Sequence, residues 1–88
     1  MLDKFTVHSS VKFVAAVELE PKNREALNNL GLVLQEEGSA EAAVDVLNEV
    51  VVAHPRYWPG FYNLGLALKD LGKIDSAIDA FKKVLQLM

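Results

Sequence analysis

Apolar residues recur along this chain at the spacing of α-helices. Between residues 24 and about 37 they lie three, four and seven positions apart, so on a 3.6-residue period they share one face of a helix. The same pattern predicts a helix over 40 to about 53, a third that ends near 71 and has Pro59 in its first turn, and a fourth from 74. The residues expected to point inward are Leu27, Leu30, Gly31 and Leu34 in the first helix, Ala43, Leu47, Val50 and Val51 in the second, and Ala77, Ile78, Phe81, Val84 and Leu85 in the last.

Glycines and short polar residues mark where these helices begin and end. Gly38 and Gly72 are expected to stop helices in the left-handed conformation, which glycine adopts without steric cost. Asn23 and Ser39 stand where a side-chain oxygen caps the first backbone N–H groups of a helix. Gly31 lies in mid-helix, where glycine costs about 1 kcal/mol relative to alanine, so we expect the backbone of a partner helix to approach closely there.

The pattern is an internal repeat. The run Asn-Leu-Gly-Leu occurs at residues 29–32 and again at 63–66. Sliding residues 21–54 over residues 55–88 gives ten identities in 34 positions, against roughly two or three for unrelated segments of ordinary composition. A fixed period of this size predicts stacked helical units, each of which buries its apolar face only against a neighbour.

The repeated residues resemble the tetratricopeptide repeat. In a 34-residue repeat beginning at Trp58, family positions 7, 8, 11, 15, 20, 24 and 27 hold Leu64, Gly65, Leu68, Gly72, Ala77, Phe81 and Val84. Position 4, where the family favours a large aromatic residue, holds Leu27 and Phe61, which is a mild departure. The resemblance implies an all-α array of antiparallel helix-turn-helix repeats with about five helices in one domain. Residues 24–57 and 58–88 would be full repeats, and residues 1–22 the second helix of a preceding one.

In this family the first helices of stacked repeats line a concave groove that binds peptide segments. Carried over to this sequence, the resemblance places in that groove Asn28, Asn29, Leu32 and Gln35 from one repeat and Tyr62, Asn63, Leu66 and Lys69 from the next. Asn29 and Asn63 share a repeat position, and a carboxamide both donates to and accepts from a peptide backbone. The alternative for these asparagines is a hydrogen bond between neighbouring helices. Tyr62 and the two leucines would supply apolar contacts to the peptide.

The two ends of such an array carry apolar residues that the chain itself does not cover. Phe13 and Ala16 would face the missing first helix of their repeat, and Ile74, Ile78 and Leu85 would face a following repeat. We therefore expect homo-oligomers formed through the terminal helices. This gives an alternative to peptide binding, a self-assembling structural or scaffold unit. A fragment of a longer array, whose parent covers both ends, would show the same pattern.

Composition narrows the functional classes. The net charge is −3 and the nine Lys and Arg are scattered, which argues against nucleic acid as a partner. No apolar run approaches the roughly 18 residues of a membrane span, and the start of the chain lacks a signal-peptide core. We therefore expect no membrane insertion, a cytoplasmic location, and a protein or peptide as the partner.

Candidate chemistry is sparse. The chain has no cysteine, and its two histidines, His8 and His54, fall at the start and in the turn between the repeats. No zinc-protease motif, phosphate-binding loop or nucleophile elbow occurs. The sequence predicts a non-catalytic protein without a metal ion or other cofactor.

Overall fold

The computed structural model describes residues 23–88, in which all regular secondary structure is α-helical. The four helices are α3 (Arg24–Glu36), α4 (Ala40–Ala53), α5 (Trp58–Asp70) and α6 (Ile74–Leu87). Their bounds lie within one residue of those predicted from the pattern of apolar residues. The described part thus holds four of the five helices predicted for the whole chain. The remaining prediction, a helix within residues 1–22, lies outside the described residues.

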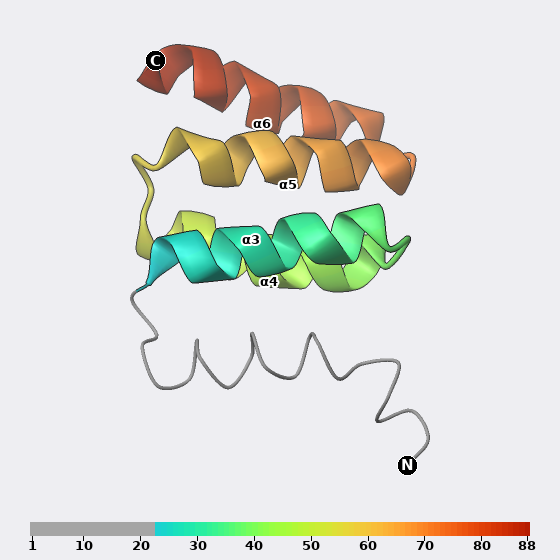
Figure 1. The fold of residues 1–88 in the computed structure, drawn as a ribbon. Helices are drawn as coiled ribbons and strands as arrows, with labels where there is room; N and C mark the ends of the chain where they lie inside the picture. Colours follow the sequence, from blue (N-terminus) through green and yellow to red (C-terminus); the bar gives the residue numbers. More distant parts are fainter. Residues whose placement is uncertain (1–22) are drawn as a thin grey trace.

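The helices form two antiparallel hairpins stacked on each other. In Figure 1, α3 runs in front of α4, α5 lies next to this pair, and α6 lies at the top of the stack. α5 packs against both helices of the first hairpin, whereas α6, among the described helices, packs against α5 alone. One side of α6 therefore has no described helix against it. The predicted all-α architecture of helical hairpins is confirmed.

Both hairpin turns use the same backbone motif. Gly38 and Gly72 have φ angles of +87° and +80°, the left-handed conformation predicted for both. In the first turn the N–H of Ser39 donates to the Leu34 carbonyl at 2.8 Å, and in the second the N–H of Lys73 donates to the Leu68 carbonyl at 2.9 Å. These bonds satisfy carbonyls that a helix end leaves without partners.

Of the two predicted helix caps, one is present and the other is not. Asn23 caps α3 as predicted, since its Oδ1 accepts the N–H of Ala26 at 3.0 Å. The predicted cap at Ser39 is wrong, because its side chain makes no capping hydrogen bond. Ser39 has a ψ of 60°, short of the extended backbone that most capping residues adopt, and the turn motif already fixes its N–H.

The core lies between the two hairpins. A cluster of buried residues from α4, α5 and α6 forms its centre, and it consists of Ala43, Leu47, Leu64, Ala67, Leu68, Ala77 and Ala80. Leu34, Val44, Val51 and Phe81 pack against this cluster with part of their surface exposed. The prediction that Ile78 and Leu85 point inward is wrong, because both are exposed. They lie on a flank of α6, beside its buried side, where no described helix covers them.

Gly31 and Gly65 hold the same place in the two hairpins. A Cβ added at Gly31 would lie 2.5 Å from side-chain atoms of Leu47, and one added at Gly65 would lie 2.5 Å from Phe81. The close approach predicted at Gly31 is therefore present, although the group that fills the space is a side chain rather than backbone. Each glycine lets the first helix of its hairpin pack closely onto a large residue of the second.

Candidate functional site

Two hydrogen bonds join the first helices of the two hairpins. Asn63 Nδ2 donates to Asn28 Oδ1 at 3.0 Å, and Gln35 Nε2 donates to Asp70 Oδ2 at 2.6 Å. Asn28 and Gln35 are seven residues apart on α3, as are Asn63 and Asp70 on α5, so the two bonds lie about two helical turns apart. They fix the register of α3 against α5. We call the surface around these bonds the α3–α5 face.

The asparagine pair differs from the one suggested by the repeat. Asn28 and Asn63 are each 8% exposed, whereas Asn29, which shares a repeat position with Asn63, is exposed. A shared repeat position places two residues on corresponding sides of their helices, and it does not bring them into contact. Asn63 therefore makes a hydrogen bond between neighbouring helices, which was the alternative to contact with a peptide. A contact between Asn29 or Asn63 and a peptide stays a prediction.

Leu32 and Leu66 occupy the centre of the α3–α5 face. Leu32 lies between Asn28 and Gln35 on α3, Leu66 lies between Asn63 and Asp70 on α5, and both leucines are partly exposed. The face therefore has an apolar centre with a polar hydrogen-bonded pair on either side. Such an arrangement can accept one apolar side chain of a peptide and hydrogen-bond the peptide backbone beside it.

Tyr62 and Lys69, the other two predicted groove residues, are exposed on α5. The Tyr62 ring lies next to Phe81 of α6, with ring centroids 6.0 Å apart and an angle of 54° between the planes. Tyr62 and Lys69 hold the same repeat positions as Asn28 and Gln35, which form hydrogen bonds with the next repeat. Tyr62 and Lys69 therefore lie at the edge where a further helix would pack.

Asp70 also stands at a position that the family places in the groove, and the structure shows which residue it contacts. It accepts the hydrogen bond from Gln35, and the two residues are 35 positions apart, like Asn28 and Asn63.

Comparison with protein families agrees with this geometry. Two models of the tetratricopeptide repeat match the chain, one over residues 12–58 and the other over residues 58–87. The chain belongs to the tetratricopeptide repeat family. Tetratricopeptide repeats generally mediate protein–protein interactions and are typically non-catalytic. No curated protein matches the chain.

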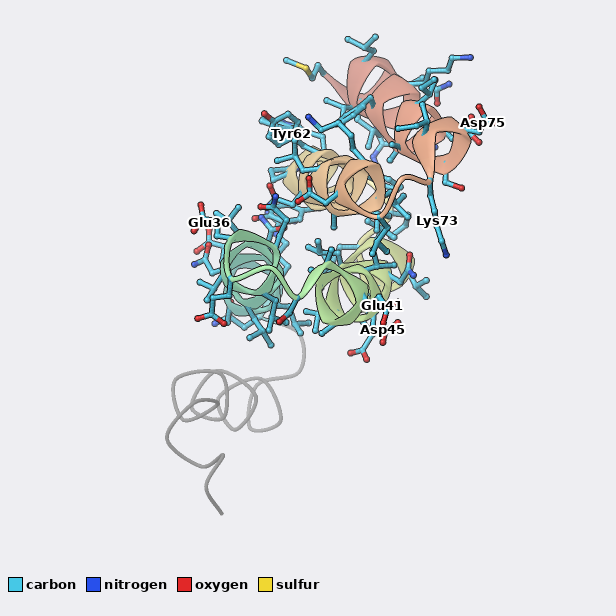
Figure 2. All side chains as sticks on the ribbon, turned by 90° about the vertical axis from the view of Figure 1, so that its right-hand side faces the viewer. Glu36, Glu41, Asp45, Tyr62, Lys73 and Asp75 are labelled. Carbon is cyan, nitrogen blue, oxygen red and sulfur yellow. The ribbon has the colours of Figure 1, made fainter. Side chains whose placement is uncertain are left out.

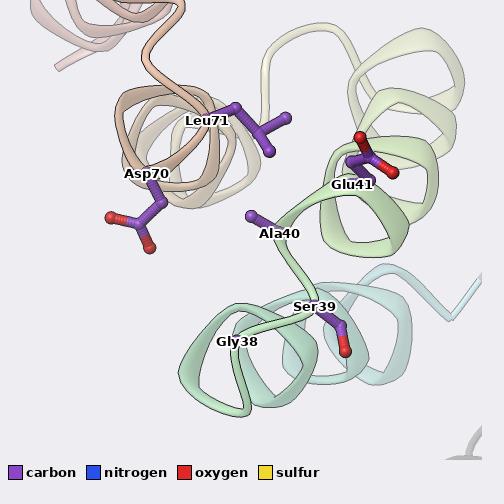
Figure 3. A pocket seen from close by; sticks show the side chains of 6 residues that line it. All are labelled: Gly38, Ser39, Ala40, Glu41, Asp70 and Leu71. Atoms are coloured by element: carbon purple, nitrogen blue, oxygen red, sulfur yellow. The ribbon is translucent and has the colours of Figure 1, made fainter.

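Two hollows lie at the end of this tetratricopeptide repeat chain where both hairpin turns are found. The larger, about 490 Å³, is lined by Gly38, Ser39, Ala40, Glu41, Asp70 and Leu71 (Figure 3). The smaller, about 340 Å³, is lined by Glu41, Val44, Asp45, Leu71 and Lys73. Figure 2 shows Glu36, Glu41, Asp45 and Asp75 at this end, together with Lys73. In residues 23–88 no group of three or more histidine or acidic side chains is placed to hold a metal ion.

The turn between the two tetratricopeptide repeats contains an aromatic contact and a histidine. The Arg24 guanidinium lies over the Tyr57 ring, 4.4 Å from its centroid, and so links the start of α3 to the start of α5. His54 closes α4, and its Nε2 is enclosed without a hydrogen-bond partner in the described part of the chain. These residues connect the two repeats and do not assemble into a reactive site.

Three of the five residues predicted for self-association lie in the described part of the chain. Ile74, Ile78 and Leu85 are 50%, 44% and 74% exposed. Phe13 and Ala16 lie outside the described residues. Every helix in residues 23–88 is too short or too polar to span a lipid bilayer.

Proposed function

We propose that the chain is a protein-interaction module without catalytic activity, and that it binds a peptide segment along the α3–α5 face. The observation behind this proposal is the placement of Leu32 and Leu66, partly exposed, between the Asn28–Asn63 and Gln35–Asp70 hydrogen bonds. Because these bonds hold the two helices in register, the face loses little conformational freedom when a ligand binds, and that lowers the cost of binding.

The ligand would make two kinds of contact. An apolar side chain would pack against the two leucines. The Asn28 amide group and the Asn63 carbonyl oxygen, which the bond between them does not use, would hydrogen-bond the peptide backbone. Two helices offer a small surface, so we expect a dissociation constant on the order of micromolar.

A peptide display library is the direct test. Peptides selected on the purified chain should bind it with micromolar affinity in calorimetry, and Leu66→Asp should weaken that binding about tenfold or more. Val52→Asp is the matched control, because Val52 is 81% exposed on α4 and remote from this face. Failure to select any peptide, or equal weakening by both variants, would contradict the proposal.

A second candidate function is a self-assembling scaffold unit. It is favoured by the exposure of Ile74, Ile78 and Leu85 on one side of α6. Apolar surface of this kind contributes about 25 cal/mol per Å² when a partner covers it.

A further inference from the structure

One side of α6, with the adjoining edge of α5, forms an uncovered apolar surface. We call it the end face, and it consists of Tyr62, Lys69, Ile74, Ile78, Phe81 and Leu85. Four of these residues are large apolar side chains with substantial exposure, and Phe81 is half-buried beside Tyr62. Among the described helices α6 packs against α5 alone, so this side of α6 has no helix on it (Figure 1).

The first hairpin shows what the equivalent surface does when it is covered. Moving back 34 residues from each member of the end face gives Asn28, Gln35, Ala40, Val44, Leu47 and Val51. α5 packs on this surface, and there Ala40 is 8% exposed and Leu47 fully buried. The end face is therefore equivalent to the surface of the first hairpin on which α5 packs, and no described helix covers it.

The end face is nevertheless not a copy of the covered surface. Every one of its residues is larger than the equivalent 34 positions earlier, with Ile74 in place of Ala40 and Leu85 in place of Val51. On the covered surface a Cβ added at Gly60 of α5 would lie only 3.3 Å from Val51, and Ala40 adjoins the end of α5. A helix placed like α5 would meet bulkier side chains at both ends of α6. The end face instead offers more apolar area to a partner that approaches differently.

Charges beside the apolar stripe indicate which partner fits. Asp75 and Lys82 are both exposed and seven residues apart, so they lie on the same flank of α6, Asp75 in its first turn and Lys82 about two turns further along. Lys83 points to another side, where it lines a hollow against α5. On α4 the equivalents of Asp75 and Lys82 are Glu41 and Asn48, so the covered surface lacks this division of charge.

We propose that the end face is a homodimer interface in which α6 packs antiparallel against α6 of a second copy. A two-fold axis perpendicular to α6 brings this flank of one copy beside the same flank of the other with its ends reversed. Asp75 of each copy then faces Lys82 of the other, and the stripe of Ile74, Ile78 and Leu85 packs on its own counterpart. The inference rests on the scaffold function proposed above and specifies the contact that it uses.

Sedimentation velocity of the full chain between about 1 and 200 µM tests the contact. We expect a concentration-dependent dimer, which Ile78→Asp and Leu85→Asp each weaken roughly tenfold or more. Both sites are exposed, so circular dichroism should show unchanged helix content in these variants. Val52→Asp is the matched control and should dimerise like the original chain. A monomer at every concentration overturns both the scaffold function and the interface, whereas a dimer that survives Ile78→Asp and Leu85→Asp overturns the interface alone.

Charge exchange tests the antiparallel arrangement. Asp75→Lys and Lys82→Asp should each weaken the dimer several-fold, since each places like charges together across the two-fold axis. The double variant, with both changes in one chain, restores opposite charges and should recover the original dissociation constant. If the double variant is no tighter than the single ones, the antiparallel arrangement is wrong.

Discussion

The two hairpins of this chain have equivalent surfaces, of which one is covered by a helix and the other is exposed. On the first hairpin the outer surface of α4 is covered by α5, and Ala40 and Leu47 are almost completely buried there. On the second hairpin the equivalent surface of α6 carries Ile74 and Phe81 instead, and it is open. The backbone motif that closes each hairpin is the same, with a left-handed glycine at Gly38 or Gly72 in both. The difference between the hairpins is therefore in side chains, not in how the helices are built.

This comparison separates residues that fold the chain from residues available for binding. At each of these repeat positions the open hairpin has a larger residue than the covered one, and Asn28 and Ala40 are replaced by the more apolar Tyr62 and Ile74. Selection for folding alone does not explain such a change, because an exposed apolar side chain contributes little to the stability of a monomer. Residues on covered and on open surfaces should therefore differ in how much they stabilise the monomer, which unfolding in urea at low protein concentration measures.

The largest difference is expected between a buried and an exposed leucine. Leu47 is fully buried, so Leu47→Ala should lower the free energy of unfolding by about 3 kcal/mol through lost burial and the cavity left behind. Leu85 is 74% exposed, so Leu85→Ala should change it by less than about 0.5 kcal/mol. Similar losses from the two changes would mean that a helix covers α6 in the monomer as well.

A smaller difference is expected at the hydrogen-bonded edge of α5. Asn63→Ala leaves the Asn28 carbonyl oxygen without its donor in a site that is 8% exposed, which should cost about 2 kcal/mol. Tyr62→Ala, on the open edge, removes an exposed ring and its contact with Phe81, and should cost under about 1 kcal/mol. Asn29→Ala is the control, with an expected change within about 0.5 kcal/mol. A loss at Asn29 as large as that at Asn63 would contradict the hydrogen-bond assignment.

The smallest difference is expected at the two mid-helix glycines. The added methyl group of Gly31→Ala meets Leu47, which has no free space around it, so the overlap should outweigh the higher helix propensity of alanine by about 1 kcal/mol. Gly65→Ala meets Phe81, which is partly exposed and can turn toward solvent, so the two effects should nearly cancel. Equal destabilisation by both variants would show that Phe81 is held as firmly as Leu47.

The sequence predicted the helices closely because their ends depend on local chemistry. Asn23, Gly38 and Gly72 act through bonds or backbone angles within a few residues of themselves. Ser39 was the exception, since a capping residue needs a backbone conformation that the preceding turn does not provide. Family positions likewise recovered Leu64, Leu68 and Ala77 of the core, because these recur with the repeat, whereas the buried Ala67 and Ala80 were not predicted.

Contacts between helices were harder to predict, because they depend on how one repeat is placed against the next. The repeat aligned Asn29 with Asn63, but the structure pairs Asn63 with Asn28, one position earlier on α3. The apolar stripe of α6 is wider than the one helix beside it covers, so periodicity alone could not tell Val84, which is buried, from Leu85, which is exposed. The seven-residue spacing of Asp75 and Lys82 can be read from the sequence, but that they flank an exposed apolar stripe could not.

Hydroxyl-radical footprinting at increasing protein concentration tests most directly the claim that the α6 surface is open in the monomer and covered in a dimer. In dilute solution we expect Ile74, Ile78 and Leu85 to be oxidised readily, as Val52 is, while Leu47 stays protected. As the concentration rises, the three α6 residues should become protected and Val52 should not. Oxidation of the α6 residues at one constant rate over the whole range, parallel to Val52, would contradict the account.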